Sequence, residues 1–255
     1  KGIKVLLNGQ GADELFGGYT IYFAHYYLSV NRNKKKELLN SIKNSPISLS
    51  DLKKDILKLR FQKWLPNSLY SFLKFKKKRF RKYLSFKNTD SSLNQSLDFD
   101  KALKGDYYGQ RLREMLHWED RNSMAHSIES RNPFSDDRVL AKLALALPIE
   151  NKIQEGWSKY FLRKEFLEYL PLEIANRVDK KGYSMPDVEW NKKWKEKIKE
   201  SLGNEKLSKY LNTKEILHDF ERLIASNDID IHRFLFRVMS LSHFLDLQEE
   251  INEVA

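Results

Sequence analysis

The stretch VLLNGQGADELFGGY, residues Val5 to Tyr19, decides the fold that the sequence predicts. An apolar run rich in branched side chains stops at Asn8, and four of the chain's 10 glycines follow within residues 9–18. Short apolar runs bounded by Asn and Gly are typical of strands, and the pattern becomes helical after Gly11. We therefore expect a buried strand over residues 3–7, then a glycine-rich turn, then a helix.

The turn between this strand and helix has a chemistry suited to phosphate groups. Backbone N–H groups gather there at the carboxyl end of the strand, where α/β proteins bind phosphates. Gly9 and Gly11 allow a nucleotide to approach the backbone closely. Asp13 offers the oxygen ligand that Mg²⁺ prefers, and Glu14 offers either a second ligand or a capping charge. The spacing matches neither GxGxxG nor GxxxxGK[ST], so a glycine turn with a capping acid stays open.

The composition is that of a globular protein. Of 255 residues, 41% are hydrophobic and 13% aromatic, which is enough for a sizeable core. No apolar run approaches the roughly 20 residues that span a bilayer. The chain has no cysteine, which excludes disulfides, thiolate nucleophiles and zinc–thiolate sites. We expect a cytoplasmic protein, and a start at Lys1-Gly2 directly before the strand suggests a chain cut from something longer.

The rest of the chain is predicted to be helical. Apolar residues recur at helical spacing over residues 139–147, 161–170 and 234–245, and the first two runs stop at prolines. The polar residues 85–98 are typical of a loop or linker. The fold class that we expect is therefore mainly α with one short strand. Since one strand cannot make a complete α/β domain, most of its sheet is expected elsewhere.

Much of the net charge of +11 lies in the basic run KFKKKRFRKY, residues 74–83. A solvated, lysine-rich helix or connector is the leading interpretation. The interleaved rings of Phe72, Phe75, Phe80 and Tyr83 could instead anchor single-stranded nucleic acid. No nucleic-acid motif accompanies them, so nucleic acid is not the expected partner and this binding module stays the minor alternative.

Two further segments carry candidate functional residues. In residues 118–140, carboxylates alternate with arginines around an Asn-Pro-Phe break, with Glu129 and Arg131 before it and Asp136 after it. This pattern predicts a helix that delivers polar side chains into a cleft, although a structural ion-pair network fits equally well. Residues 170–190 read as a loop in which Lys180 could close over phosphates and neutralise their charge. Taken alone, that loop is more typical of plain surface.

Together, in this order, the three segments resemble the C-terminal synthetase domain of the glutamine-dependent asparagine synthetase family. The resemblance rests on LNGQGADELFGGY, on EDRNSMAHSIESRNPFSDDRVLAKLALALP and on KYFLRKEFLEYLPLEIANRVDKKGYSMPDVEW. It covers about residues 5–19, 118–148 and 159–190, and more faintly 232–247.

The resemblance implies the C-terminal part of an adenine-nucleotide alpha-hydrolase-like (ATP pyrophosphatase) α/β domain. Residues 1–24 would form its strand–loop–helix nucleotide motif. Residues 25–105 would be a variable basic segment and linker, and residues 106–255 a helical part with the substrate and lysine-loop motifs. All 255 residues would thus belong to one partial synthetase domain.

The resemblance also implies an activity. ATP activates the side-chain carboxylate of aspartate as an acyl-adenylate, and ammonia then attacks to give asparagine, AMP and pyrophosphate. By position, the resemblance implies that Asn8, Gly9 and Gly11 contact the nucleotide and that Asp13 binds Mg²⁺ and pyrophosphate. Lys180 would stabilise charge on the phosphates, and Gln10 would take part in the chemistry of the intermediate. The acceptor site would be lined or braced by Glu129, Arg131 and Asp136.

Two departures from the family pattern bear on the acceptor. Gln10 stands where the family usually has glutamate, and an amide cannot act as a base although it still forms hydrogen bonds. Asn8 replaces a usual serine. A sugar acid or a peptide carboxylate is therefore an alternative acceptor to aspartate.

The family's pyrophosphate-binding S-G-G-x-D-S loop and its N-terminal glutaminase domain are not in these residues. We therefore expect a fragment that neither hydrolyses glutamine nor works alone as a ligase. The glutaminase domain is expected in the same full-length chain, and a homodimer is compatible with the resemblance.

Overall fold

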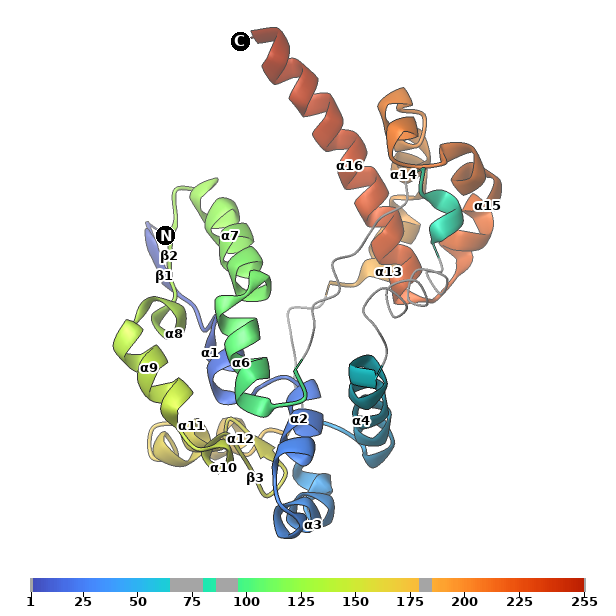
Figure 1. Cartoon of the computed structure of the whole chain (residues 1–255). Helices are drawn as coiled ribbons and strands as arrows, with labels where there is room; N and C mark the ends of the chain where they lie inside the picture. The colour runs from blue at the N-terminus through green and yellow to red at the C-terminus, as the bar shows by residue number, and fades with distance from the viewer. Residues whose placement is uncertain (1, 65–79, 86–95, 179–184, 255) are drawn as a thin grey trace. The chain divides into compact units, whose positions relative to one another are not determined.

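The computed structural model describes residues 2–64, 80–85, 96–178 and 185–254, and the side chains of all of these except 249–254 (Figure 1). The chain divides into two compact units, which are described separately. Unit 1 comprises Lys1–Tyr70 and Leu93–Lys180, and unit 2 comprises Ser71–Ser92 and Lys181–Ala255. Each unit is therefore built from segments that are distant in the sequence.

Unit 1 contains, in chain order, β1 (Val5–Leu7), α1 (Ala12–Phe16), α2 (Ile21–Ser29), α3 (Arg32–Asn40), η1 (Ile42–Asn44), α4 (Leu49–Trp64), α6 (Phe99–Tyr108), α7 (Gln110–Met124), β2 (Glu129–Arg131), α8 (Pro133–Asp136), α9 (Arg138–Ala146), α10 (Ile149–Lys152), β3 (Ile153–Gln154), β4 (Trp157–Ser158), α11 (Tyr160–Glu165) and α12 (Leu172–Ala175). Unit 2 contains η2 (Arg81–Tyr83), α13 (Asp187–Lys193), α14 (Lys195–Ser201), η3 (Glu205–Lys209), α15 (Thr213–Ala225) and α16 (Ile229–Val254). The prediction of a mainly helical protein is confirmed.

The prediction of a single strand is wrong, because four short strands occur within the described residues. β1 pairs with β2 in parallel, with Val5 opposite Glu129 and Leu7 opposite Arg131. β3 and β4 form a small antiparallel hairpin. Residues 129–131, which we expected at the end of a helix, are extended because α7 ends at Met124 and Ser127 turns the chain with a φ of 55°. The backbone of β1 then supplies their hydrogen-bond partners.

The strand over residues 3–7 is present but is not buried as predicted. Val5 is 40% exposed and Leu7 is 77% exposed. Parallel sheets are normally covered on both faces, and their strands are apolar for that reason. Within the described residues, β2 is the only strand paired with β1. The apolar side chains of β1 therefore lack, in this part of the chain, the further strands or helices that would normally bury them.

Two apolar clusters hold unit 1 together. The larger one centres on α2, whose Tyr22 and Phe23 pack with Leu52 of α4 and Phe99 of α6. Helices α2, α3 and α4 thus form core structure within the segment that the resemblance left as variable. The smaller cluster packs α1 on α9, with Phe16 against the rings of Phe134 and Phe161 at centroid distances of 6.1 and 6.3 Å. This second cluster fixes the turn that precedes α1.

The predicted helices agree with the structure to different degrees. The run over 139–147 matches α9, and the run over 234–245 lies within α16. The run over 161–170 is helical only to Glu165, in α11. The predicted loop over 170–190 contains α12 and the start of α13, and its residues 179–184 lie outside the described part.

Unit 2 is a helical cluster formed by η2, η3 and α13 to α16 (Figure 1). Phe80 stacks on Phe234 with centroids 4.7 Å apart, and the buried Tyr83 stacks on the same ring at 5.4 Å. Two of the four rings that could have bound nucleic acid therefore serve the core of unit 2. The basic residues 74–79 and the polar residues 86–95 are not described.

A helix that spans a bilayer needs about 20 predominantly apolar residues. Among the described residues, no helix combines enough length with enough apolar character to cross a membrane.

Candidate functional site

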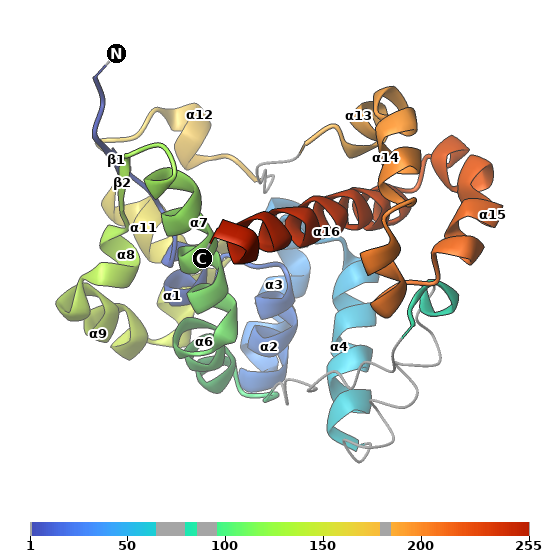
Figure 2. The same cartoon turned by 90° about the horizontal axis from the view of Figure 1, so that it is seen from above.

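The first two sequence segments meet at the carboxyl ends of β1 and β2. The Asn8 amide N–H donates to the carbonyl oxygen of Arg131 at 2.8 Å, which extends the parallel ladder by one residue. The glycine turn therefore begins beside the turn that leads from β2 into α8 (Figures 1 and 2). In an α/β protein, this edge of a parallel sheet is where ligands bind.

A carboxylate from α7 joins the glycine turn to strand β2. Glu119 Oε1 accepts hydrogen bonds from Asn8 Nδ2, at 2.5 Å, and from the hydroxyl of Ser130. The Asn8 side-chain oxygen in turn accepts from the N–H of Gly9 at 2.6 Å. The other Glu119 oxygen is buried and has no hydrogen-bond partner among the described residues. Sequence reasoning missed Glu119, and only its place at the start of the second segment could have indicated it.

The glycines of the turn serve different purposes. A Cβ at Gly9 would meet no atom within 4 Å, so packing inside this chain does not demand glycine there. Gly11 has a φ of 96°, and a Cβ would lie 3.2 Å from the backbone of Phe134 in α8. Gly11 therefore shapes the turn, whereas Gly9 leaves open space at its surface.

The third segment reaches the same place through Lys159. Its Nζ lies 2.7 Å from Asp13 Oδ1, and a Cβ on Gly18 would overlap this ion pair. The backbone holds Lys159 firmly, since its φ is 52° and its N–H donates to the carbonyl oxygen of Phe16 at 3.2 Å. Sequence reasoning quoted this lysine in the third segment without giving it a role.

The sequence left Glu14 either as a second Mg²⁺ ligand or as a capping charge at the helix start, and the structure buries it in the first turn of α1. Its side chain is 1% exposed and accepts a hydrogen bond from the Tyr19 hydroxyl at 2.5 Å. Burial raises the pKa of the Glu14 carboxyl above its ordinary value of 4.5. The guanidinium of Arg111 lies over the Tyr19 ring at 4.7 Å. Glu14 and Tyr19 thus belong to the support beneath the turn.

The candidate acceptor residues lie on β2 and α8. Glu129 Oε1 accepts from Arg131 Nε at 2.8 Å, and both side chains are exposed. Asp136 Oδ2 accepts from the backbone N–H of Asn132 at 2.9 Å and so closes the α8 turn. Asn132 is itself buried, and its side-chain oxygen has no hydrogen-bond partner among the described residues. Asp136 therefore braces the turn, while Glu129 and Arg131 face solvent.

The structure brings together most of the candidate residues, though not all of them. Gln10 lies half-buried within the turn, one residue before Gly11. Lys180 falls outside the described residues. In the part of the chain that is described, no group of three or more His, Cys, Asp and Glu side chains is arranged to hold a metal ion.

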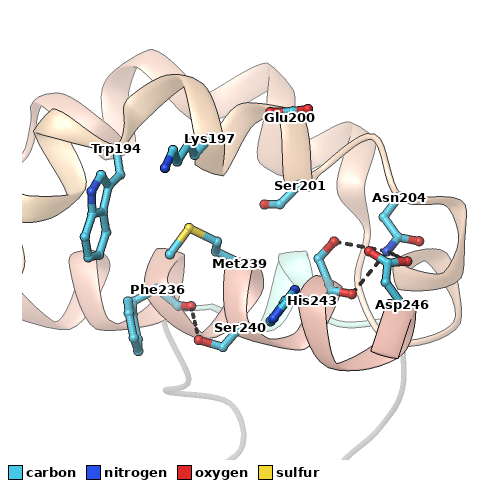
Figure 3. A pocket seen from close by; sticks show the side chains of 11 residues that line it. Trp194, Lys197, Glu200, Ser201, Asn204, Phe236, Met239, Ser240, His243 and Asp246 are labelled. Carbon is cyan, nitrogen blue, oxygen red and sulfur yellow. Dashed lines mark hydrogen bonds between the residues drawn. The ribbon is translucent and has the colours of Figure 1, made fainter. Parts of the chain in front are cut away.

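Unit 2 has a surface groove of about 790 Å³ between α14 and α16 (Figure 3). Trp194, Phe236 and Met239 line its apolar end. At the other end the amide of Asn204 donates to Asp246 Oδ1 at 3.0 Å. None of the candidate residues named above lines this groove.

Comparison with known proteins gives one consistent result. The family model for asparagine synthase matches residues 1–244. The chain is 31% identical over 208 residues to asparagine synthetase [glutamine-hydrolyzing] 1 of Bacillus subtilis, covering 75% of this chain and 32% of the relative. It is 30% identical over 204 residues to a putative asparagine synthetase [glutamine-hydrolyzing] of Mycobacterium tuberculosis, covering 74% of this chain and 31% of that protein.

A shorter match, 51% identical over 43 residues, is to a putative asparagine synthetase [glutamine-hydrolyzing] 1 of Methanocaldococcus jannaschii, and it covers 17% of this chain and 8% of that protein. No solved structure gives a significant match. The chain spans about a third of the length of the first two relatives. With a family model matching nearly the whole chain, and with the three segments meeting where β1 and β2 end, the chain belongs to the asparagine synthase family.

Proposed function

We propose that the full-length protein is an ATP-dependent, amide-forming ligase and that this chain is part of its synthetase domain. ATP activates the side-chain carboxylate of aspartate as an acyl-adenylate and releases pyrophosphate. Ammonia then attacks the acyl carbon and displaces AMP, which gives asparagine. Family membership supports this proposal. The observation that carries it is the Asp13–Lys159 ion pair directly after the glycine turn at the end of β1.

The nucleotide contacts the turn formed by Asn8, Gly9 and Gly11. The open space at Gly9 supports this role, because it lets a nucleotide approach the backbone closely. The buried, unpartnered oxygen of Asn132 belongs to the neighbouring turn after β2 and can accept a hydrogen bond from a polar ligand. Gly11 also gives this turn its shape, through its positive φ.

Asp13 is the residue that would hold Mg²⁺. This ion commonly takes only one or two carboxylates and completes its shell with waters and substrate phosphates, so a site without three clustered acidic side chains among the described residues fits it. An ion held by Asp13 would supply positive charge next to the phosphates. Lys159, 2.7 Å from Asp13, orients this carboxylate and adds a positive charge next to it. Lys180 supplies a second positive charge as the phosphate bond breaks.

The acceptor carboxylic acid binds beside the end of β2. Arg131 is exposed there and offers a fork of N–H donors suited to a carboxylate, with Glu129 holding its Nε. Asp136 keeps the adjacent turn closed. Gln10 hydrogen-bonds the intermediate without acting as a base, since a side-chain amide does not take up a proton as a carboxylate does.

A second candidate function is amidation of a different carboxylate, such as a sugar acid or a peptide. Asn8 and Gln10 favour it, because both depart from the usual family residues, and Asn8 is drawn towards Glu119. Product analysis of the full-length enzyme with aspartate and with such acids separates the two functions. A product only from aspartate rules the alternative out.

The full-length protein would contain further parts besides this chain. We propose that the same full-length chain carries a glutaminase domain that supplies ammonia, and a pyrophosphate loop facing the glycine turn within an ATP pyrophosphatase-type sheet. The exposed apolar side chains of β1 support this, since further strands would cover them. We propose that the protein acts in the cytoplasm on small-molecule substrates and that it can form a homodimer.

The test is aspartate-dependent exchange of labelled pyrophosphate into ATP, measured on the full-length enzyme. We expect Lys180→Ala to abolish exchange while leaving glutamine hydrolysis intact, because the lysine acts on phosphate charge only. Lys181→Ala, one residue along, is the matched control and is expected to retain exchange. Normal exchange in Lys180→Ala would remove the role assigned to that residue.

A further inference from the structure

Arg163 on α11 joins two stretches of backbone that belong to different parts of the third segment. Its Nε donates to the carbonyl oxygen of Ser158 at 2.9 Å, and its Nη1 donates to the carbonyl oxygen of Ala175 at 2.5 Å. Its guanidinium also lies over the ring of Trp157, 4.9 Å from the ring centre. One side chain therefore bridges the end of β4 and the end of α12.

The two carbonyl groups stand shortly before candidate functional residues. Ser158 immediately precedes Lys159, whose ammonium pairs with Asp13. Ala175 ends α12 and, in sequence, lies five residues before Lys180. A bridge between these two carbonyls therefore fixes the backbone that carries Lys159 against the end of α12.

The chemistry of the bridge requires arginine. The guanidinium is planar and presents its N–H groups in a fixed fork, so it can bond two carbonyls at a set separation, whereas an ammonium is a single point of charge. The Arg163 side chain is half-buried, and this burial lowers the pKa of its guanidinium. The carbonyl oxygens and the face of Trp157 compensate for that lost hydration.

The backbone next to this bridge has further fixed contacts. Lys159 is held in a left-handed conformation, and the Arg163 N–H donates to its carbonyl oxygen at 3.1 Å. A backbone clamped at these points has little freedom to compensate if the bridge to α12 is lost. α12 itself has only four residues and is exposed apart from Ala175, so it depends on such a contact for its position.

We propose that Arg163 is a positioning residue for the ligase reaction: it fixes the end of β4 against the end of α12, so that Lys159, directly after β4, keeps its place beside Asp13 and the reacting phosphates. This inference rests on the proposed function. Arg163 touches neither the nucleotide nor the acceptor and acts through the backbone of the residues that do.

The test compares Arg163→Lys with Lys164→Ala, its exposed neighbour on α11, in the full-length enzyme. Arg163→Lys keeps the charge and most of the length but loses the fork. We expect kcat for aspartate-dependent ATP–pyrophosphate exchange to fall about 100-fold, as a misplacement of about 1 Å can do. KM for aspartate and the rate of glutamine hydrolysis are expected to stay unchanged, and Lys164→Ala to behave as wild type.

Hydrogen exchange adds a readout that does not depend on the activity. In Arg163→Lys, the amides of residues 172–178 are expected to exchange faster, while those of α2 and α6 stay as protected as in the wild type. Guanidinium ion added to Arg163→Ala is expected to restore part of the lost kcat. Unchanged kinetics of the ATP–pyrophosphate reaction together with unchanged protection of 172–178 would overturn the proposal.

A fall in glutamine hydrolysis that parallels the loss of adenylation would also overturn it, since that pattern means general unfolding. If the wild-type enzyme shows no aspartate-dependent exchange at all, the proposed function fails instead. In that case the hydrogen-exchange comparison still decides whether Arg163 fixes α12.

Discussion

At the scale of single residues, the acidic pair after the glycine turn illustrates how neighbours acquire opposite roles. Asp13 faces Lys159 and is part of the candidate site, whereas Glu14 points into the protein and meets the Tyr19 hydroxyl. The sequence could not separate them, because both carboxylates suit the start of a helix. The direction in which each side chain points depends on what packs against α1, and that is a tertiary property.

The raised pKa of Glu14 makes a prediction about stability and pH. Because burial raises the pKa above 4.5, the folded protein binds this proton more tightly than the unfolded chain does. The stabilisation from this group is complete below pH 4.5 and is lost as pH rises through the folded-state pKa. We expect Glu14→Gln to be more stable than wild type at pH 7, with the difference shrinking towards pH 4.

Thermal unfolding of the full-length protein across this pH range measures the effect. The amide introduced by Glu14→Gln still offers an oxygen to the Tyr19 hydroxyl, so the change chiefly removes the buried charge. Glu173→Gln, at an exposed position, serves as the control. A Glu14→Gln effect of the same size at pH 4 and pH 7 would contradict the assigned cause.

At the scale of elements, two adjacent aspartates in the turn after β2 have different structural roles. Asp136 closes the α8 turn through the N–H of Asn132. Asp137 caps α9, because its Oδ1 accepts from the N–H groups of Val139 and Leu140 at 2.8 and 3.0 Å. The apolar spacing of 139–147 predicts α9, and the capping aspartate explains where it begins.

We expect Asp137→Ala to destabilise the protein by about 1 kcal/mol, the usual cost of removing a side-chain cap. In a domain of this size the melting temperature falls by roughly 2–4 °C for each kcal/mol. Lys142→Ala, at an exposed position in the middle of α9, is the control and should change little. Scanning calorimetry of both variants measures the difference, and equal melting temperatures would show that the cap is not needed.

At the scale of the whole molecule, the chain builds each unit from separated segments. Residues 80–85 belong to unit 2 although unit 1 residues lie on both sides of their segment. Their anchor is Tyr83, which is 2% exposed, packs on Phe234 and donates to Asp219 Oδ2 at 2.5 Å. Lys82 also pairs with Asp219, and hydrogen bonds from both side chains hold the pKa of that carboxyl well below its ordinary value.

We expect Tyr83→Ala to destabilise unit 2 by about 3–5 kcal/mol, the usual cost of removing a large buried ring. Hydrogen exchange should then speed up in α15 and α16 while α2 and α6 in unit 1 keep their protection. Tyr108→Ala, which removes an exposed ring of unit 1, is the control. If hydrogen exchange became faster in unit 1 but stayed unchanged in unit 2, residues 80–85 would not belong to unit 2.

The sequence by itself determined the helical character, the position of α9 and most of α16, the strand before the glycine turn, and the family. These features follow from local spacing and from contiguous motifs, which are readable without a third dimension. It did not reveal β2, the burial of Glu14 or the roles of Glu119, Lys159 and Arg163. Several of these depend on partners far along the chain, such as Asn8 with Glu119 or Asp13 with Lys159. Only the tertiary structure brings such partners within hydrogen-bond distance, so it alone decided which polar residues form the site and which support it.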